Sequence, residues 1–236
     1  MIKRIARTAG FSGLLAALLL TLLQSFWVAP LILEAETYES AAPSTEHHSH
    51  DIQATVGHEH ATAHEHSADA WSPEDGWQRI LSTTGGNLVV AVGFALILAA
   101  LYSLREPNRV TTGALWGLAG FAVFCLAPTL GLPPELPGTA AADLGQRQNW
   151  WIGTAAATAL GLALLVFARH WLLKALGAVL LVVPHVIGAP QPEVHESLAP
   201  EALETQFKIA SWATNAAFWL ALGLLSAWLY RRSSQA

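Results

Sequence analysis

The sequence predicts an all-α integral membrane protein with six transmembrane helices, both termini in the cytoplasm, and a long, disordered, histidine-rich external loop. The first observation is composition: the 236 residues are 53% hydrophobic and only 12% charged, whereas a soluble domain needs more polar surface. The second is a set of six apolar stretches that approach the roughly 20 residues needed to cross about 30 Å of hydrocarbon. The third is the distribution of basic residues, which gather in alternate connecting segments.

The expected spans form a single membrane domain, 1–236, and follow one another at about 9–29, 84–104, 112–131, 148–168, 171–188 and 209–230. The first follows basic residues, as a signal peptide would, but its apolar run is long and "FWVAPLILEAE" offers no small-x-small cleavage site. We therefore interpret it as a retained anchor. The third contains Gly113, Gly117 and Gly120, which permit close helix packing. The fifth is short and carries Pro184 and His185 near its end.

The charged residues orient these spans. With a cytoplasmic N-terminus, nine of the twelve basic residues lie on the inner side: Lys3, Arg4, Arg7, Arg105, Arg109, Arg169, Lys174, Arg231 and Arg232. Of the seventeen acidic residues, only Glu106 lies there. Because basic residues near span ends resist translocation, this alternation favours an even number of spans with both termini inside. The net charge of −5 gives no support for nucleic-acid binding.

The expected external loop, 30–83, contains a histidine-rich tract, 44–69. The tract holds seven of the ten histidines: His47, His48, His50, His58, His60, His64 and His66. Three His-x-His pairs recur in it, and in an extended chain the two imidazoles of such a pair point to the same side, about 7 Å apart, where both can bind one cation. Free histidine is mostly neutral at pH 7 and available as a ligand. We expect a metal-binding tract; the alternative is a solvated low-complexity segment.

Imidazole ligands favour Co²⁺, Ni²⁺, Cu²⁺ or Zn²⁺ over Mg²⁺ or Ca²⁺. A flexible set of imidazoles follows the Irving–Williams order, so the tract cannot by itself select cobalt. The single cysteine, Cys125, lies in an apolar run and is interpreted as a buried core thiol. It excludes intramolecular disulfides and multi-cysteine metal sites. The spans contain no nucleophile–base pair or compact metal motif, so we do not expect an enzyme.

Polar residues near the external ends of the spans predict an outer vestibule for cations. They are the carboxylates Glu34, Glu36, Glu135 and Asp143 and the amides Asn87, Asn149 and Asn215. His185 is expected to receive the metal, because Pro184 removes a backbone donor and leaves a carbonyl free nearby. The structural alternatives are solvated loop acids, interhelical hydrogen bonds from each asparagine, and a membrane-edge histidine that is satisfied by backbone.

Five stretches of the chain resemble a known family: "PLILEAETYE", the histidine-rich tract, "LWGLAGFAVFCLAPTLGLPPELPG", "AADLGQRQNWW" and "PHVIGAPQPE". Together they are similar to the CbtA-like family of predicted cobalt transporter subunits, from the first span to the sixth. The resemblance implies a bacterial inner-membrane protein that imports cobalt for cobalamin synthesis, and its partner would be a small single-span CbtB-like subunit. It implies Co²⁺ as the ion, whereas the residues alone also leave Ni²⁺ and Zn²⁺ open. It supplies no catalytic residues.

The sequence thus predicts a multi-pass protein in contact with membrane lipid, located in the bacterial inner membrane with its histidine-rich loop on the periplasmic side. The expected function is uptake of a divalent transition metal ion, and the resemblance points to cobalt. The alternative function is a membrane-bound component that binds or senses metal outside the cell without transporting it.

Overall fold

The computed structural model describes residues 2–41 and 73–233. Within these ranges the chain is helical apart from its connecting loops and one isolated β-bridge. The elements, in chain order, are α1 (Ile2–Leu23), the π-helical η1 (Gln24–Val28), α2 (Ala29–Ala41), α3 (Trp77–Leu104), α4 (Val110–Phe121), the π-helical η2 (Ala122–Leu126), α5 (Ala127–Gly131), α6 (Leu144–Phe167), α7 (Trp171–Ile187) and α8 (Glu201–Arg232).

The described helices confirm the predicted all-helical membrane fold. Five are long and apolar enough to cross a membrane: Ile2–Ala41, Trp77–Leu104, Val110–Gly131, Leu144–Phe167 and Glu201–Arg232. The fifth expected span corresponds to α7, a shorter apolar helix of 17 residues. A rise of about 1.5 Å per residue places that length at the lower limit for crossing hydrocarbon. Helices suit this environment because they satisfy their backbone polar groups internally.

Three helices extend by seven residues or more beyond the spans that hydropathy predicts. Residues 30–41, expected in the external loop, continue the first helix to Ala41, and α3 begins at Trp77 rather than at 84. Likewise, α8 begins at Glu201 rather than at 209. Hydropathy detects only the apolar part of a helix, whose length is set by the thickness of the hydrocarbon layer. More polar turns can continue the helix beyond that part, because their backbone groups remain hydrogen-bonded within it. The expected external loop, 30–83, is therefore helical at both ends.

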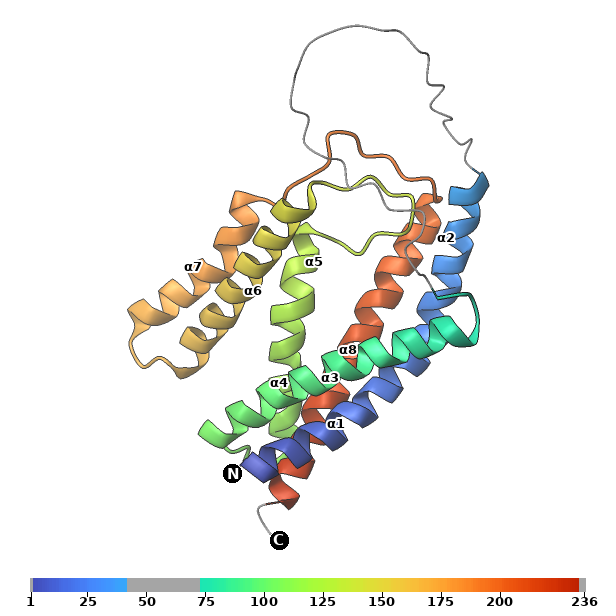
Figure 1. Ribbon diagram of the computed structural model, residues 1–236. Helices are drawn as coiled ribbons and strands as arrows, with labels where there is room; N and C mark the ends of the chain where they lie inside the picture. Colours follow the sequence, from blue (N-terminus) through green and yellow to red (C-terminus); the bar gives the residue numbers. More distant parts are fainter. Residues whose placement is uncertain (1, 42–72, 234–236) are drawn as a thin grey trace, which may run out of the picture.

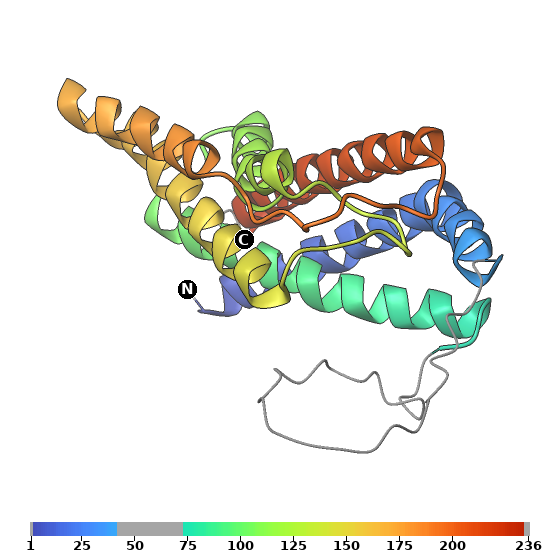
Figure 2. The same cartoon turned by 90° about the horizontal axis from the view of Figure 1, so that it is seen from above.

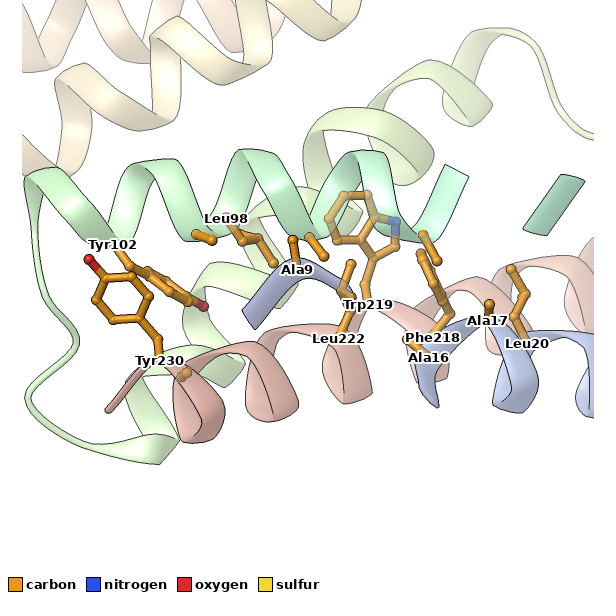
Figure 3. Close-up of a cluster of buried hydrophobic side chains, with 14 residues drawn as sticks. Ala9, Ala16, Ala17, Leu20, Leu98, Tyr102, Phe218, Trp219, Leu222 and Tyr230 are labelled. Atoms are coloured by element: carbon orange, nitrogen blue, oxygen red, sulfur yellow. The ribbon is translucent and has the colours of Figure 1, made fainter. Parts of the chain in front are cut away.

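Helices α1, α3 and α8 form the central body, with α4 packed along α8 (Figure 1). Large buried side chains of α3 and α8, including Leu98, Tyr102 and Trp219, pack against small residues of α1, such as Ala9 and Ala16 (Figure 3). Small residues let helix backbones approach closely, which is how transmembrane helices gain packing contacts where hydrophobic burial gives little.

Glycines bring α4 and α8 into contact. A Cβ atom on Gly113 would clash with the carbonyl oxygen of Gly223, and one on Gly117 would clash with the carbonyl oxygen of Trp219. A Cβ atom on Gly120 would meet the indole ring of Trp219. The predicted packing role of these glycines is confirmed.

Each π-helical segment overlaps the same sequence pattern, Phe-x-x-Ala-Pro, which occurs at 26–30 and at 124–128. Proline has no N–H, and its ring clashes with the carbonyl group four residues earlier in an α-helix. A wider π turn just before the proline accommodates it without ending the helix. Both helices therefore continue past the proline as α2 and α5.

Helices α6 and α7 form a hairpin that projects beside the central body and is joined to it through η2 and α5 (Figures 1 and 2). Gly161 and Gly177 lie at the contact between the two helices. A Cβ atom built on either glycine would come within 2.8 Å of the other's carbonyl oxygen.

The start of α1 and the end of α8 lie at one end of the molecule, which we call the terminal end (Figure 1). Arg4 joins the elements there: it forms a 2.5 Å ion pair with Glu106 and donates to the Tyr230 carbonyl oxygen at 2.7 Å. Its guanidinium also lies 3.6 Å above the Tyr230 ring centroid. The loops 132–143 and 188–200 lie at the opposite end, which we call the loop end.

Candidate functional site

The two loops at the loop end, 132–143 and 188–200, are hydrogen-bonded to each other and pack against the helices beneath them. Thr139 and Ser197 form an antiparallel bridge, next to which the Ala140 N–H donates to the Glu196 carbonyl at 2.9 Å. One apolar residue of each loop, Leu136 and Ala199, is buried in a cluster with residues of α2 and α8. These buried anchors fold the polar loops down over the ends of the helices.

A cavity of about 200 Å³, which we call the loop cavity, lies between these loops and α8. Six charged or titratable residues line it: Glu135, Arg147, His195, Glu196, Glu204 and Lys208. Glu135 pairs with Arg147 at 2.7 Å, and Glu204 pairs with Lys208 at 3.2 Å. Three carboxylates against two cations leave one negative charge beside a histidine, which favours a cation.

A second cavity, of about 390 Å³, lies between η1, α2 and the start of α3. Its polar lining includes Gln24, Thr83, Asp75 and Arg79. Arg79 donates to both carboxylate oxygens of Glu36, at 2.5 and 3.3 Å, and lies 3.0 Å from Asp75. On the α3 side the cavity reaches Asp75, close to residue 73, where the described part of the chain resumes after the histidine-rich tract. The tract itself, with all seven of its predicted ligands, lies outside the described residues.

The predicted vestibule carboxylates do not converge on one point. Glu135 lines the loop cavity, whereas Glu36 pairs with Arg79 at the second cavity. Glu34 is exposed on α2. Asp143 caps the N-terminus of α6, where its side chain accepts from the Gln146 N–H at 2.9 Å.

The three asparagines are also separate. Asn87 donates to Thr21 at 3.0 Å and to Gln24 at 2.7 Å, which joins α3 to α1 and η1. Asn215 donates to the Ser211 carbonyl within its own helix and accepts from the Cys125 thiol of η2 at 3.7 Å.

Asn149, by contrast, is exposed near the start of α6. Asn87 and Asn215 therefore form hydrogen bonds between helices. This is the alternative that the sequence left open to a vestibule shared by the three asparagines.

His185 is exposed on α7, and its ring centroid is 6.1 Å from that of Trp150. The histidine that lines a cavity is instead His195. Sequence reasoning missed His195 because only the folding-back of its loop places it beside Glu135. Among the residues that the structure describes, no three His, Cys, Asp or Glu side chains are grouped so as to hold a metal ion. The loop cavity can therefore attract a hydrated cation but does not form a chelating centre from these residues.

One comparison with known proteins gives a match. A family described as "Probable cobalt transporter subunit (CbtA)" matches residues 2–231. No curated protein and no solved structure matches the chain.

Proposed function

This chain belongs to the CbtA family of probable cobalt transporter subunits, and we propose that it takes up Co²⁺ across the bacterial inner membrane for cobalamin synthesis. The family match carries the proposal, since it spans nearly the whole chain and names cobalt. It gives no support to Ni²⁺ or Zn²⁺, which the residues alone had left open.

In the proposed orientation, the terminal end faces the cytoplasm and the loop end faces the periplasm. The distribution of charge supports this arrangement, because the basic residues of 3–7, 105–109 and 231–232 would lie inside. The first step is then capture of Co²⁺ by the imidazoles of the histidine-rich tract outside the cell. Because imidazole must be neutral to bind metal, capture is expected to weaken below about pH 6.

The second step is transfer to the negatively charged lining of the loop cavity, where Glu135, His195 and Glu196 offer oxygen and nitrogen donors. His185 remains a proposed acceptor at the outer edge of α7. The inside-negative membrane potential then favours inward movement by about 2.3 kcal/mol per charge per 100 mV, or nearly 5 kcal/mol for a dication.

The family name also describes a subunit, which supports a partner chain. We propose a small single-span CbtB-like subunit, seated against the lipid-facing surface of the helices. The sequence of this chain contains no nucleotide-binding motif, so any nucleotide-driven step would belong to a partner.

Uptake of labelled cobalt tests the proposal. Cells lacking their own high-affinity cobalt uptake would express the chain with and without its partner, and label that resists a brief wash with an external chelator would be measured. Accumulation that depends on the chain supports uptake. If all of the label were removed by the wash, the chain would be an external binding or sensing component, and the proposal would be wrong.

A further inference from the structure

Two buried threonine hydroxyls of α6 have no hydrogen-bond partner. Thr154 is 1% exposed and Thr158 is 3% exposed, and neither Oγ1 atom is paired. Two other buried hydroxyls do find partners: Ser12 donates to the Thr8 carbonyl at 2.7 Å, and Ser226 to the Leu222 carbonyl at 2.6 Å. The buried hydroxyls of Thr8 on α1 and Thr214 on α8 are unpaired as well, but each is the only one on its helix among the described residues. Since buried polar groups are nearly always paired in native proteins, the two threonine hydroxyls require an explanation.

Helical spacing places both threonines on the side of α6 that meets α7. Thr154, Thr158 and Gly161 are spaced four and three residues apart, which places them on one face of the helix. Gly161 identifies that face, because a Cβ atom there would lie 2.8 Å from the Gly177 carbonyl and 3.1 Å from the Leu181 side chain. Antiparallel pairing from this point sets the two threonines opposite residues 180–184 of α7.

Helix α7 contributes to the same interface a carbonyl that lacks its usual helical donor. Pro184 is buried inside the helix and has no N–H, so the Leu180 carbonyl loses its α-helical donor. Two hydroxyls and one backbone carbonyl are therefore available between helices that are otherwise apolar.

The outer end of this interface lies close to the loop cavity. Gly131 and Pro190 line that cavity, and the Trp150 indole and the Ala189 side chain both lie against Gly131. Trp150 precedes Thr154 by one helical turn, and its buried Nε1 is also unpaired. The unpaired polar atoms of α6 thus begin at Trp150, which lies against a residue of the cavity wall, and continue at Thr154 and Thr158 toward the contact between Gly161 and Gly177.

We propose that Thr154, Thr158 and the Leu180 carbonyl form the first intramembrane station for the cation that leaves the loop cavity. This inference rests on the proposed uptake of Co²⁺. Hydroxyl and carbonyl oxygens replace part of the hydration shell of the ion, and because they are neutral they bind it weakly enough for it to leave again. Such a station requires oxygen atoms that are not already engaged in hydrogen bonds within the protein. The Thr154 and Thr158 hydroxyls meet this requirement.

Replacement of both hydroxyls tests the station. Thr154→Val and Thr158→Val keep the shape of each side chain and remove its hydroxyl. Since neither hydroxyl has a partner, the thermal unfolding temperature of the double variant in detergent is expected to be unchanged or higher. The initial rate of labelled-cobalt uptake at saturating cobalt is expected to fall at least tenfold. The double variant Thr154→Ser and Thr158→Ser, which keeps the hydroxyls, should remain within twofold of the unsubstituted chain.

Thr8→Val is the matched control, because Thr8 is likewise buried and unpaired but lies on α1 near the terminal end. Its uptake should stay within twofold. If the unsubstituted chain accumulates cobalt and the double valine variant does so equally fast, the station is wrong and the proposed function stands. A lower unfolding temperature in the valine variant would assign the hydroxyls a structural role and also overturn the station. If the unsubstituted chain accumulates no cobalt, the proposed function itself is wrong.

Discussion

Asn87 shows how one polar side chain in a span acquires its role from its neighbours. An amide in an apolar environment is unfavourable unless its donors are satisfied, and the Asn87 amide nitrogen donates to both Thr21 and Gln24. The two acceptors lie on α1 and at the start of η1. Asn87 therefore joins the first helix to α3 beside the π segment, and its contribution belongs first to stability.

Removing this amide should destabilise the protein. We expect Asn87→Ala to lower the free energy of unfolding by about 0.6–2 kcal/mol, the range for interhelical hydrogen bonds in membranes. Asn149→Ala is the control, because Asn149 is exposed and should leave the stability unchanged. Thermal unfolding of the purified protein in detergent measures both. Equal stabilities for the two variants would show that the Asn87 bonds contribute nothing.

The ion pair between Glu36 and Arg79 should contribute less than its geometry suggests. Its side chains are 33% and 36% exposed, and partly exposed pairs contribute about 0.2–1 kcal/mol. We expect Arg79→Gln to lower the free energy of unfolding within that range, with a smaller effect at high salt. Exchanging the two charges should restore only part of the loss, because Asp75 would then face a glutamate. Full recovery in an unfolding assay would contradict the contribution of Asp75.

The polar residues also show why the sequence predicted ligand types better than a site. Residue type alone indicated that Glu36, Glu135 and Asp143 could offer oxygen ligands near the ends of the spans. Their partners depend on where α3, Arg147 and the start of α6 come to lie, which no local pattern records. The same holds for His195, whose position follows from the burial of Leu136 and Ala199.

At the scale of helices, the hydropathy pattern predicts spans well because hydrocarbon thickness fixes their apolar length. It predicts helix ends poorly, since a helix can continue through more polar turns, such as 34–41, whose backbone groups stay hydrogen-bonded within it. The π segments follow from a local rule that repeats in Phe-x-x-Ala-Pro, so attention to the two prolines would have found them. The unpaired threonines could not be found this way, because pairing is a property of two packed helices.

The α4–α8 contact gives a test at this scale. A Cβ atom on Gly117 would meet the Trp219 carbonyl oxygen, whereas nothing lies within 4 Å of one on Gly153. Alanine is favoured over glycine in a helix by about 1 kcal/mol, so Gly153→Ala should be neutral or stabilising. Gly117→Ala should instead destabilise by about 1–3 kcal/mol through overpacking. Unfolding temperatures of the two variants would be compared, and a stabilised Gly117→Ala protein would contradict the close packing.

For the molecule as a whole, we propose that the histidine-rich tract captures Co²⁺ and the helical body conducts it. These separate roles predict a particular concentration dependence of uptake. A tract that only concentrates Co²⁺ outside should affect uptake when the ion is scarce. Deleting residues 44–69 should therefore raise the cobalt concentration for half-maximal uptake and leave the maximal rate largely intact. The concentration dependence of labelled-cobalt uptake measures both quantities. Complete loss of transport would instead make the tract part of the path.

The direction of transport depends on which end of the molecule faces outward. The start of α1 and the end of α8 share one end, so a label on either side of the membrane can distinguish the two orientations. Cys125 is the only cysteine, and Cys125→Ala would give a background free of thiols. In that background, Gly57→Cys should react with a membrane-impermeant maleimide in intact cells. Ser234→Cys should react only after permeabilisation, because the proposed orientation, which follows the basic residues, places both termini inside. The reverse pattern would place the imidazoles in the cytoplasm, where they would bind cobalt that is stored in the cell or about to leave it. Uptake that begins at the loop end would then be wrong.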